Sequence, residues 1–232
     1  MRWFRRTARE DEVPDPRTPW PAQDVPDDPA AAAIAFWRHW FELLPEINAA
    51  LGDREPQRVE HELAGAVARL HPDLHFSLER GRHAIYALVV TGQEDPALRP
   101  YTDAWREAAP EEDAIWEYHD SVPPVPDPSG VTVNLGEQRI SLGEFRVGAQ
   151  VEDGRVDVTV FHPKLAELDE ASRAAMTFLP LDATLGERLA GERLRRVEAV
   201  EAEPAGSMSL LQLRDLVRGL GGENAENVGG PD

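Results

Sequence analysis

Residues 30–44, AAAAIAFWRHWFELL, limit the possible folds of this chain more than any other segment. Four aromatic side chains fall within six positions here: Phe36, Trp37, Trp40 and Phe41. At 3.6 residues per turn the apolar positions form two adjacent rows. One row holds Ile34, Trp37, Phe41 and Leu44, and the other holds Phe36, Trp40, Leu43 and Ile47. We therefore predict a helix that begins after Asp28, bends or ends at Pro45, and is covered by other segments over most of its circumference.

The composition bounds both the size of the fold and its chemistry. The chain has 232 residues, of which 41% are hydrophobic, and this is enough for one large domain or two small ones. It contains no cysteine, which excludes disulfides, thiolate metal ligands and cysteine nucleophiles and fits a reducing compartment. Lys164 is the only lysine and lies in no glycine-rich loop, which argues against Schiff-base chemistry and P-loop phosphate binding.

The formal net charge of the chain is −19 at pH 7. A surface this acidic repels phosphate groups, so we expect no nucleic-acid binding. The charge serves either solubility or the recognition of a basic protein partner, with mimicry of an anionic polymer as a variant of the second reading. No apolar run reaches the ~20 residues of a transmembrane helix, and no apolar segment follows the N-terminal arginines as in a secretory signal. We therefore predict a cytoplasmic protein.

Proline and glycine divide the chain into five parts. Residues 1–29 and 221–232 are predicted to be disordered tails, because prolines and aspartates crowd the first and glycines the second. The segment SVPPVPDPSG at 121–130 has four prolines and no hydrophobic periodicity. It is the predicted connection between two α+β halves, residues 30–120 and 131–220.

Both halves are predicted to follow the order hairpin, helix, strand. In the first half these elements are residues 74–78 with 82–90, then 96–108 and 114–119. In the second half they are residues 144–151 with 155–161, then 165–178 and 195–203. The two hairpin turns share the pattern Glu-x-Gly-Arg, at 79–82 and 152–155, which fits a duplicated unit, although acidic residues and glycine favour turns in any case. The order predicts an α+β fold in which helices cover an antiparallel or mixed sheet.

Two further helices complete the sequence-based prediction. One spans residues 55–70. The other follows Ser209, which forms a capping box with Gln212, and ends at Gly219 or Gly221.

Histidines and carboxylates offer candidate sites, each with a structural alternative. His75 and His83 could face each other across the first hairpin, near Asp73, as ligands for zinc or manganese. Histidines at strand ends and turns are more often structural, so no metal or cofactor is assigned. In WEYHD (116–120), Glu117 and His119 would share one face of a strand, where a carboxylate can orient an imidazole for general-base work. The alternative is a solvent-exposed strand face that carries both residues.

The one basic concentration in the predicted folded part consists of Arg188, Arg193, Arg195 and Arg196. Such a cluster could bind an anion or an acidic peptide. Because Glu187, Glu192 and Glu198 alternate with the arginines, we expect ion pairs within the chain instead.

Four stretches together resemble a family of uncharacterised bacterial proteins of the domain-of-unknown-function type. They are FWRHWF at 36–41, HPDLHFSLE at 71–79, REAAPEEDAIWEY at 106–118 and FLPLDATLGE at 178–187. The resemblance spans residues 36–201 and is most specific in the LD-x-x-LGE segment. It implies a soluble α+β domain and no assigned activity. Asp182 and Glu187 match the LD-x-x-LGE motif; the structural alternative is that Asp182 caps a turn and Glu187 begins the next helix.

Two classes of function remain after these considerations. The first, which we prefer, is a non-enzymatic protein-binding or regulatory domain whose acidic surface contacts a basic partner. The second is a hydrolase or metal-assisted enzyme that uses some of His75, His83, His119, Asp182 and Glu187, and it requires these side chains to converge in one pocket. The binding candidates from the sequence are Trp116, His119, Asp182 and Glu187.

Overall fold

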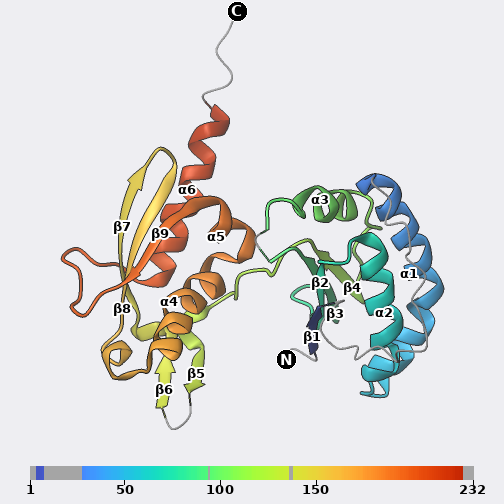
Figure 1. Ribbon diagram of the computed structural model, residues 1–232, viewed down its shortest axis with the longest axis horizontal. Helices are drawn as coiled ribbons and strands as arrows, with labels where there is room; N and C mark the ends of the chain where they lie inside the picture. The colour runs from blue at the N-terminus through green and yellow to red at the C-terminus, as the bar shows by residue number, and fades with distance from the viewer. Residues whose placement is uncertain (1–3, 8–27, 94, 136–137, 227–232) are drawn as a thin grey trace, which may run out of the picture. The chain divides into compact units, whose positions relative to one another are not determined.

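The computed structural model describes residues 4–7, 28–93, 95–135 and 138–226. The chain divides into two compact units, Met1–Val122 and Pro123–Asp232 (Figure 1). The division falls inside the predicted connection at 121–130. The described residues form an α+β structure with six α-helices and three small sheets, mixed or antiparallel, which confirms the predicted fold class.

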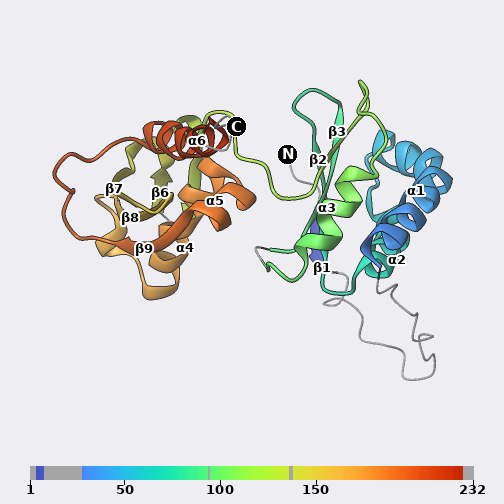
Figure 2. The same cartoon turned by 90° about the horizontal axis from the view of Figure 1, so that it is seen from above.

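The first unit is a four-stranded sheet with helices packed on one face. The strand order is β1-β2-β3-β4; β1, β2 and β3 are antiparallel, and β4 is parallel to β3. The strands are β1 (Phe4–Thr7), β2 (His75–Arg80), β3 (Tyr86–Thr91) and β4 (Trp116–His119), and the helices are α1 (Pro29–Gly52), α2 (Gln57–Leu70) and α3 (Arg99–Glu107). Both views show α1 and α2 on the same side of this sheet (Figures 1 and 2).

Strand β1 was not anticipated by the prediction of a disordered tail, since Phe4–Thr7 pair with Leu78 to His75 of β2. Residues 1–3 and 8–27 of that predicted tail lie outside the described residues. A short pattern such as FRRT carries no hydrophobic periodicity of its own, so only its partner strand defines it.

Helix α1 begins as the sequence predicts and ends later. The side chain of Asp28 accepts a hydrogen bond from Ala30 N at 3.0 Å, and Pro29 occupies the first turn. The helix does not end at Pro45 but continues to Gly52. A proline removes one backbone hydrogen bond from a helix. The ring of Pro45 lies on the exposed side of α1. Trp40 before it and Ile47 after it are buried and hold the helix on the sheet.

The expectation that α1 would be covered over most of its circumference is wrong. Ile34 and Phe41 are 57% and 55% exposed, whereas Phe36, Trp37 and Trp40 are buried. The two apolar rows predicted from the sequence therefore differ: the row of Phe36 and Trp40 enters the core, and part of the other row faces outward.

The centre of the first unit is an aromatic cluster that joins α1 to α3 and β4. Trp40 contacts the rings of Trp116 and Tyr118 at centroid distances of 4.9 and 6.0 Å. Trp37 stacks on Trp105 at 4.9 Å, and its indole N–H donates to the carbonyl oxygen of Trp105 at 2.7 Å. Edge-to-face and stacked arrangements of this kind add to the burial energy of each ring, so these contacts fix the position of α1 on the sheet.

The second unit contains a hairpin, a three-stranded sheet and three helices. The hairpin joins β5 (Thr132–Leu135) and β6 (Gln138–Ser141), and the sheet has the order β7-β8-β9, with β7 (Arg146–Glu152) antiparallel and β9 (Leu194–Ala199) parallel to β8 (Arg155–Phe161). The helices are α4 (Glu170–Leu185), α5 (Glu187–Arg193) and α6 (Leu210–Glu226). Val147, Val156, Val158 and Val160 of the sheet are buried with Met176 and Leu181 of α4.

Two helix ends in this unit differ from the prediction, and one beginning agrees with it. Helix α4 continues through Pro180 to Leu185 rather than ending near Phe178, and α6 runs past Gly219 and Gly221 to Glu226. The capping box of α6 is confirmed: Gln212 N donates to Ser209 Oγ at 3.3 Å, and Ser209 N donates to Gln212 Oε1 at 2.9 Å. No helix of the described residues is long and apolar enough to cross a membrane.

The predicted order of hairpin, helix and strand is present in both units. In each unit an antiparallel hairpin (β2-β3 or β7-β8) is followed by helical structure and then by a strand parallel to the second hairpin strand (β4 or β9). The units differ around this common order, because α1 and α2 precede it in the first and α6 follows it in the second.

The aromatic cluster should dominate the stability of the first unit. We expect Trp40→Ala to lower the free energy of unfolding by about 3–5 kcal/mol, because it removes a fully buried ring between α1 and β4. Denaturant unfolding followed by circular dichroism measures this. The matched control is Ile115→Ala, next to Trp116 but 42% exposed, which should lower the free energy of unfolding by less than about 1 kcal/mol. An equal loss of stability in the two variants would contradict the dominant role of the aromatic cluster.

Candidate functional site

The four candidate residues from the sequence lie in different environments. Trp116 is buried, and its indole N–H donates to Asn48 Oδ1 at 2.9 Å, so it is part of the core. His119 ends β4 and is partly buried. Asp182 is exposed within α4 rather than in an irregular turn, and Glu187 is the first residue of α5. The first two belong to the first unit and the last two to the second.

Glu117, between Trp116 and Tyr118, is the most unusual ionisable residue of the first unit. Its side chain is on the face of β4 opposite the aromatic cluster and is only 2% exposed. Its oxygens accept hydrogen bonds from the backbone N–H groups of Arg82 at 2.8 Å, His83 at 2.9 Å and Ala84 at 3.2 Å. A fourth contact is with Nε2 of His119 at 3.1 Å. The carboxylate therefore holds the loop between β2 and β3.

These contacts determine the charge of Glu117. Burial by itself raises the pKa of the carboxyl group, but the donors of Arg82 and His83, together with His119 and Ala84, outweigh it and lower the pKa to about 2. The alternative of a solvent-exposed strand face is therefore wrong for Glu117. The Glu117–His119 pair does exist, but the carboxylate is engaged by backbone donors, and its role on this geometry is to anchor a loop.

The proposed pairing of His75 and His83 across the hairpin is wrong. His75 is opposite Thr91 at the start of β2, and His83 lies in the loop beyond Arg80, at the other end of the strand. At about 3.3 Å per residue, the length of β2 alone separates these positions by roughly 16 Å. Among the described residues no group of three or more His, Cys, Asp or Glu side chains is placed to hold a metal ion.

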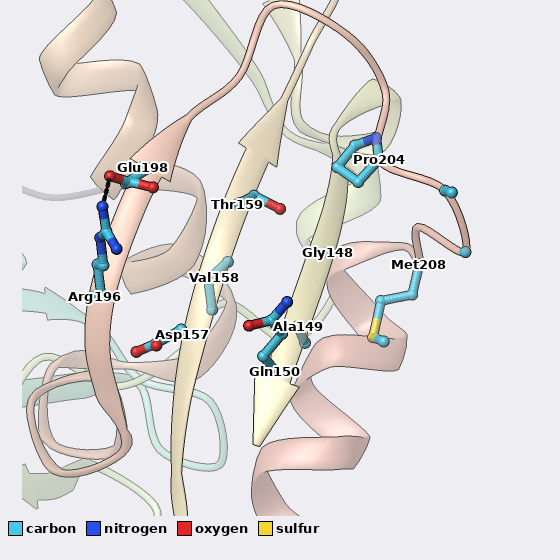
Figure 3. A pocket seen from close by; sticks show the side chains of 12 residues that line it. Gly148, Ala149, Gln150, Asp157, Val158, Thr159, Arg196, Glu198, Pro204 and Met208 are labelled. Carbon is cyan, nitrogen blue, oxygen red and sulfur yellow. Dashed lines mark hydrogen bonds and ion pairs between the residues drawn. The ribbon is translucent and has the colours of Figure 1, made fainter. Parts of the chain in front are cut away.

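The second unit contains a cavity of about 350 Å³ on the face of its sheet that points away from the valine core (Figure 3). Between β7 and β8, the strand register places Gly148 beside Thr159 and Gln150 beside Asp157. Between β8 and β9, it places Asp157 beside Arg196 and Thr159 beside Glu198. The connection from β9 to α6 closes one side with Pro204 and Met208. It returns to the sheet where Met208 exchanges two backbone hydrogen bonds with Val147, at 2.8 and 2.9 Å.

The charges around this cavity are largely paired. Arg195 donates to both oxygens of Asp157, at 2.9 and 2.6 Å, and lies 2.5 Å from Glu152. The hydrogen bond from Arg195 lowers the pKa of Asp157. Arg196 pairs with Glu198. The expectation of ion pairs within the arginine cluster is thus confirmed for Arg195 and Arg196, although the partners of Arg195 come from β7 and β8, which sequence proximity could not show.

The outer face of α4 is a third feature that the sequence analysis did not identify. Phe178 and Leu179 are 51% and 39% exposed. Ala171, Ala174 and Ala175 are exposed on the same side, and Asp182 follows one turn after Phe178. Apolar residues recur at helical spacing on both sides of α4, with polar residues between them. The sequence pattern alone therefore did not indicate which side of the helix is covered.

Comparison with models of protein families, with curated proteins and with solved structures finds no match for this chain. The resemblance to a family of uncharacterised bacterial proteins therefore stays a prediction.

Glu117 should make the stability of the protein depend on pH in acid. Its folded pKa of about 2 lies below the ordinary value of 4.5, so its contribution is complete above about pH 5 and is lost as pH falls toward 2. The shift corresponds to about 3 kcal/mol. Glu117→Gln, whose amide N–H₂ opposes backbone donors, should destabilise the protein at pH 7 and flatten this acid dependence.

Urea unfolding between pH 2.5 and 7 measures the effect. The matched control is Glu62→Gln on the exposed side of α2, which should retain the wild-type profile. An unchanged profile for Glu117→Gln would show that Glu117 does not anchor the loop.

We expect that Gly148 is required for the connection between β9 and α6 to approach the sheet closely. A Cβ atom at this position would lie 2.6 Å from Thr159 Oγ1 and 3.2 Å from Pro204 Cβ. Gly148→Ala should therefore displace the connection and cost about 1–3 kcal/mol of stability, with faster proteolysis at 200–207 as a second readout. The control is Gly130→Ala, where an added Cβ meets nothing within 4 Å; equal behaviour of the two variants would contradict the prediction.

Proposed function

We propose that this protein is a non-enzymatic protein-binding or regulatory domain, and that the outer face of α4 binds a segment of a basic protein partner. The observation that carries the proposal is the exposure of Phe178 and Leu179 on one side of a helix, beside Asp182. Large apolar side chains that are grouped on a surface and bordered by charge often mark an interaction site, whereas apolar side chains scattered singly over a surface do not.

Charge favours a basic partner for this face. Residues 123–232 contain 19 acidic and 11 basic residues, and the whole chain carries −19. A partner segment with an apolar anchor and a nearby arginine or lysine would cover Phe178 and Leu179 and place its charge next to Asp182. Long-range attraction would also speed the encounter and oppose acidic or nucleic-acid ligands.

The enzymatic alternative has less support from the geometry. Glu117 and His119 are adjacent, but the carboxylate is held by three backbone donors and its low pKa makes it a weak base. Asp182 and Glu187, the other acidic candidates, lie in separate helices, α4 and α5. We place the protein in the cytoplasm, because a chain without cysteine fits a reducing compartment.

The proposal is tested with the full chain as bait against proteins of its own source cells, at low and high salt, with quantitative mass spectrometry. We expect a partner whose recovery falls several-fold with Phe178→Ala and with Asp182→Asn, and which is weakened at high salt because charge contributes to binding. The matched control is Phe41→Ala, an equally exposed phenylalanine of α1 in the first unit, which should retain the partner.

Two results would contradict the proposal. One is a partner that is recovered equally with Phe178→Ala and with the wild-type chain. The other is the absence of any partner at either salt concentration. Purified partner and chain then allow the affinity to be measured directly, where Phe178→Ala should weaken binding about tenfold or more if it is a central anchor.

A further inference from the structure

The outer face of α1 carries a second exposed strip, independent of α4. Its members follow helical spacing of three or four residues: Ala31, Ile34, Arg38, Phe41, Pro45 and Ala49, all exposed. At 1.5 Å per residue the strip is about 27 Å long. It lies opposite the face that buries Phe36 and Trp40. A strip of this length with two large apolar side chains is the kind of surface that another helix covers.

Arg38 lies in the middle of the strip and distinguishes the possible occupants. It is exposed, and no ion pair joins it to another described residue. Glu42 follows one turn later at the border of the strip, 68% exposed, with His39 as a neighbour at 3.1 Å. The strip therefore combines apolar groups, one cation and one anion on a single helix, which makes it complementary to an inverted copy of itself.

We propose that a second copy of this chain covers the strip, with the two α1 helices antiparallel about a two-fold axis between Arg38 and Phe41. In this register Arg38 of one protomer lies over the ring of Phe41 and near the carboxylate of Glu42 of its partner, and the reverse pair repeats across the axis. Cation–π and ion-pair contacts then supplement apolar burial. Ile34 faces Pro45, and Ala31 lies within about 1.5 Å of the level of Ala49, where small residues allow close approach.

The antiparallel arrangement follows from the position of the charges. Parallel helices in register would oppose Arg38 with Arg38 and Glu42 with Glu42, which repel. A two-fold axis instead uses the same patch on both protomers and closes the assembly at two chains. The proposal does not depend on the α4 site, since it concerns a different unit and a different occupant.

The oligomeric state of the full chain provides the first test, measured by sedimentation equilibrium at about 0.3 M salt, which screens repulsion between two acidic chains. The wild-type chain should form dimers as concentration rises. Phe41→Ala should raise the dimer dissociation constant about tenfold or more, whereas the matched Phe178→Ala should leave it unchanged. The proposal would be overturned if the wild-type chain stays monomeric, or if Phe41→Ala leaves the dimer dissociation constant unchanged.

Charge reversal tests the register. Arg38→Glu and Glu42→Arg should each weaken the dimer, because each creates like charges across the axis. The double variant should regain most of the lost affinity, a rescue that a merely structural role of either residue would not produce. Failure of the double variant to recover would overturn the proposed pairing.

Cross-linking tests the orientation, and a chain without cysteine makes each introduced thiol unique. A mixture of Ala31→Cys and Ala49→Cys chains, treated with a short thiol cross-linker, should give a product that joins positions 31 and 49. Either variant alone should give little cross-linked product, because the same residue in the two protomers lies roughly 26 Å apart along antiparallel helices. A product from Ala31→Cys alone, or none from the mixture, would overturn the antiparallel arrangement.

Discussion

The contact of Trp40 with Trp116 and Tyr118 is the interaction on which the rest of the first unit depends. Strand β4 is only four residues long and pairs with one neighbour, β3, so its ladder of hydrogen bonds alone is weak support. The rings of α1 and α3 cover one face of this strand. The other face presents Glu117 to the β2–β3 loop. The aromatic packing thus also positions the carboxylate that holds the loop.

This coupling explains why a buried carboxylate is tolerated next to the core. A buried charge without partners is costly, and Glu117 reaches enough donors only if the loop turns back toward β4. Gly81 permits that turn, because a Cβ atom at this position would lie 2.5 Å from the carbonyl oxygen of Ala84. Aromatic packing, the carboxylate and the glycine therefore support one local structure, and none of them requires a ligand.

The sequence predicted element types and their order, because hydrophobic periodicity reports which residues can share a face. It failed where tertiary contacts override local signals: Pro180 lies inside α4, and Pro45, which was expected to bend or end α1, does not end it. It also could not locate the partners of Arg195, since strand register, not sequence distance, brings Asp157 and Glu152 to it. Glu117 was noticed for its neighbour His119, but its backbone donors, 33 to 35 residues away, left no trace in the sequence pattern.

Phe41 and Phe178 show the same difficulty at the surface. Each is a large apolar side chain on a helix, and each is more than half exposed, because a helix that packs on one side of a sheet buries only part of its circumference. The remaining row has to be covered by something else or stay in water. The charges beside the two phenylalanines differ: Arg38 and Glu42 make the α1 strip complementary to itself, whereas the charged residue one turn from Phe178 is Asp182. One helix therefore favours a second copy of the chain, and the other favours a basic partner.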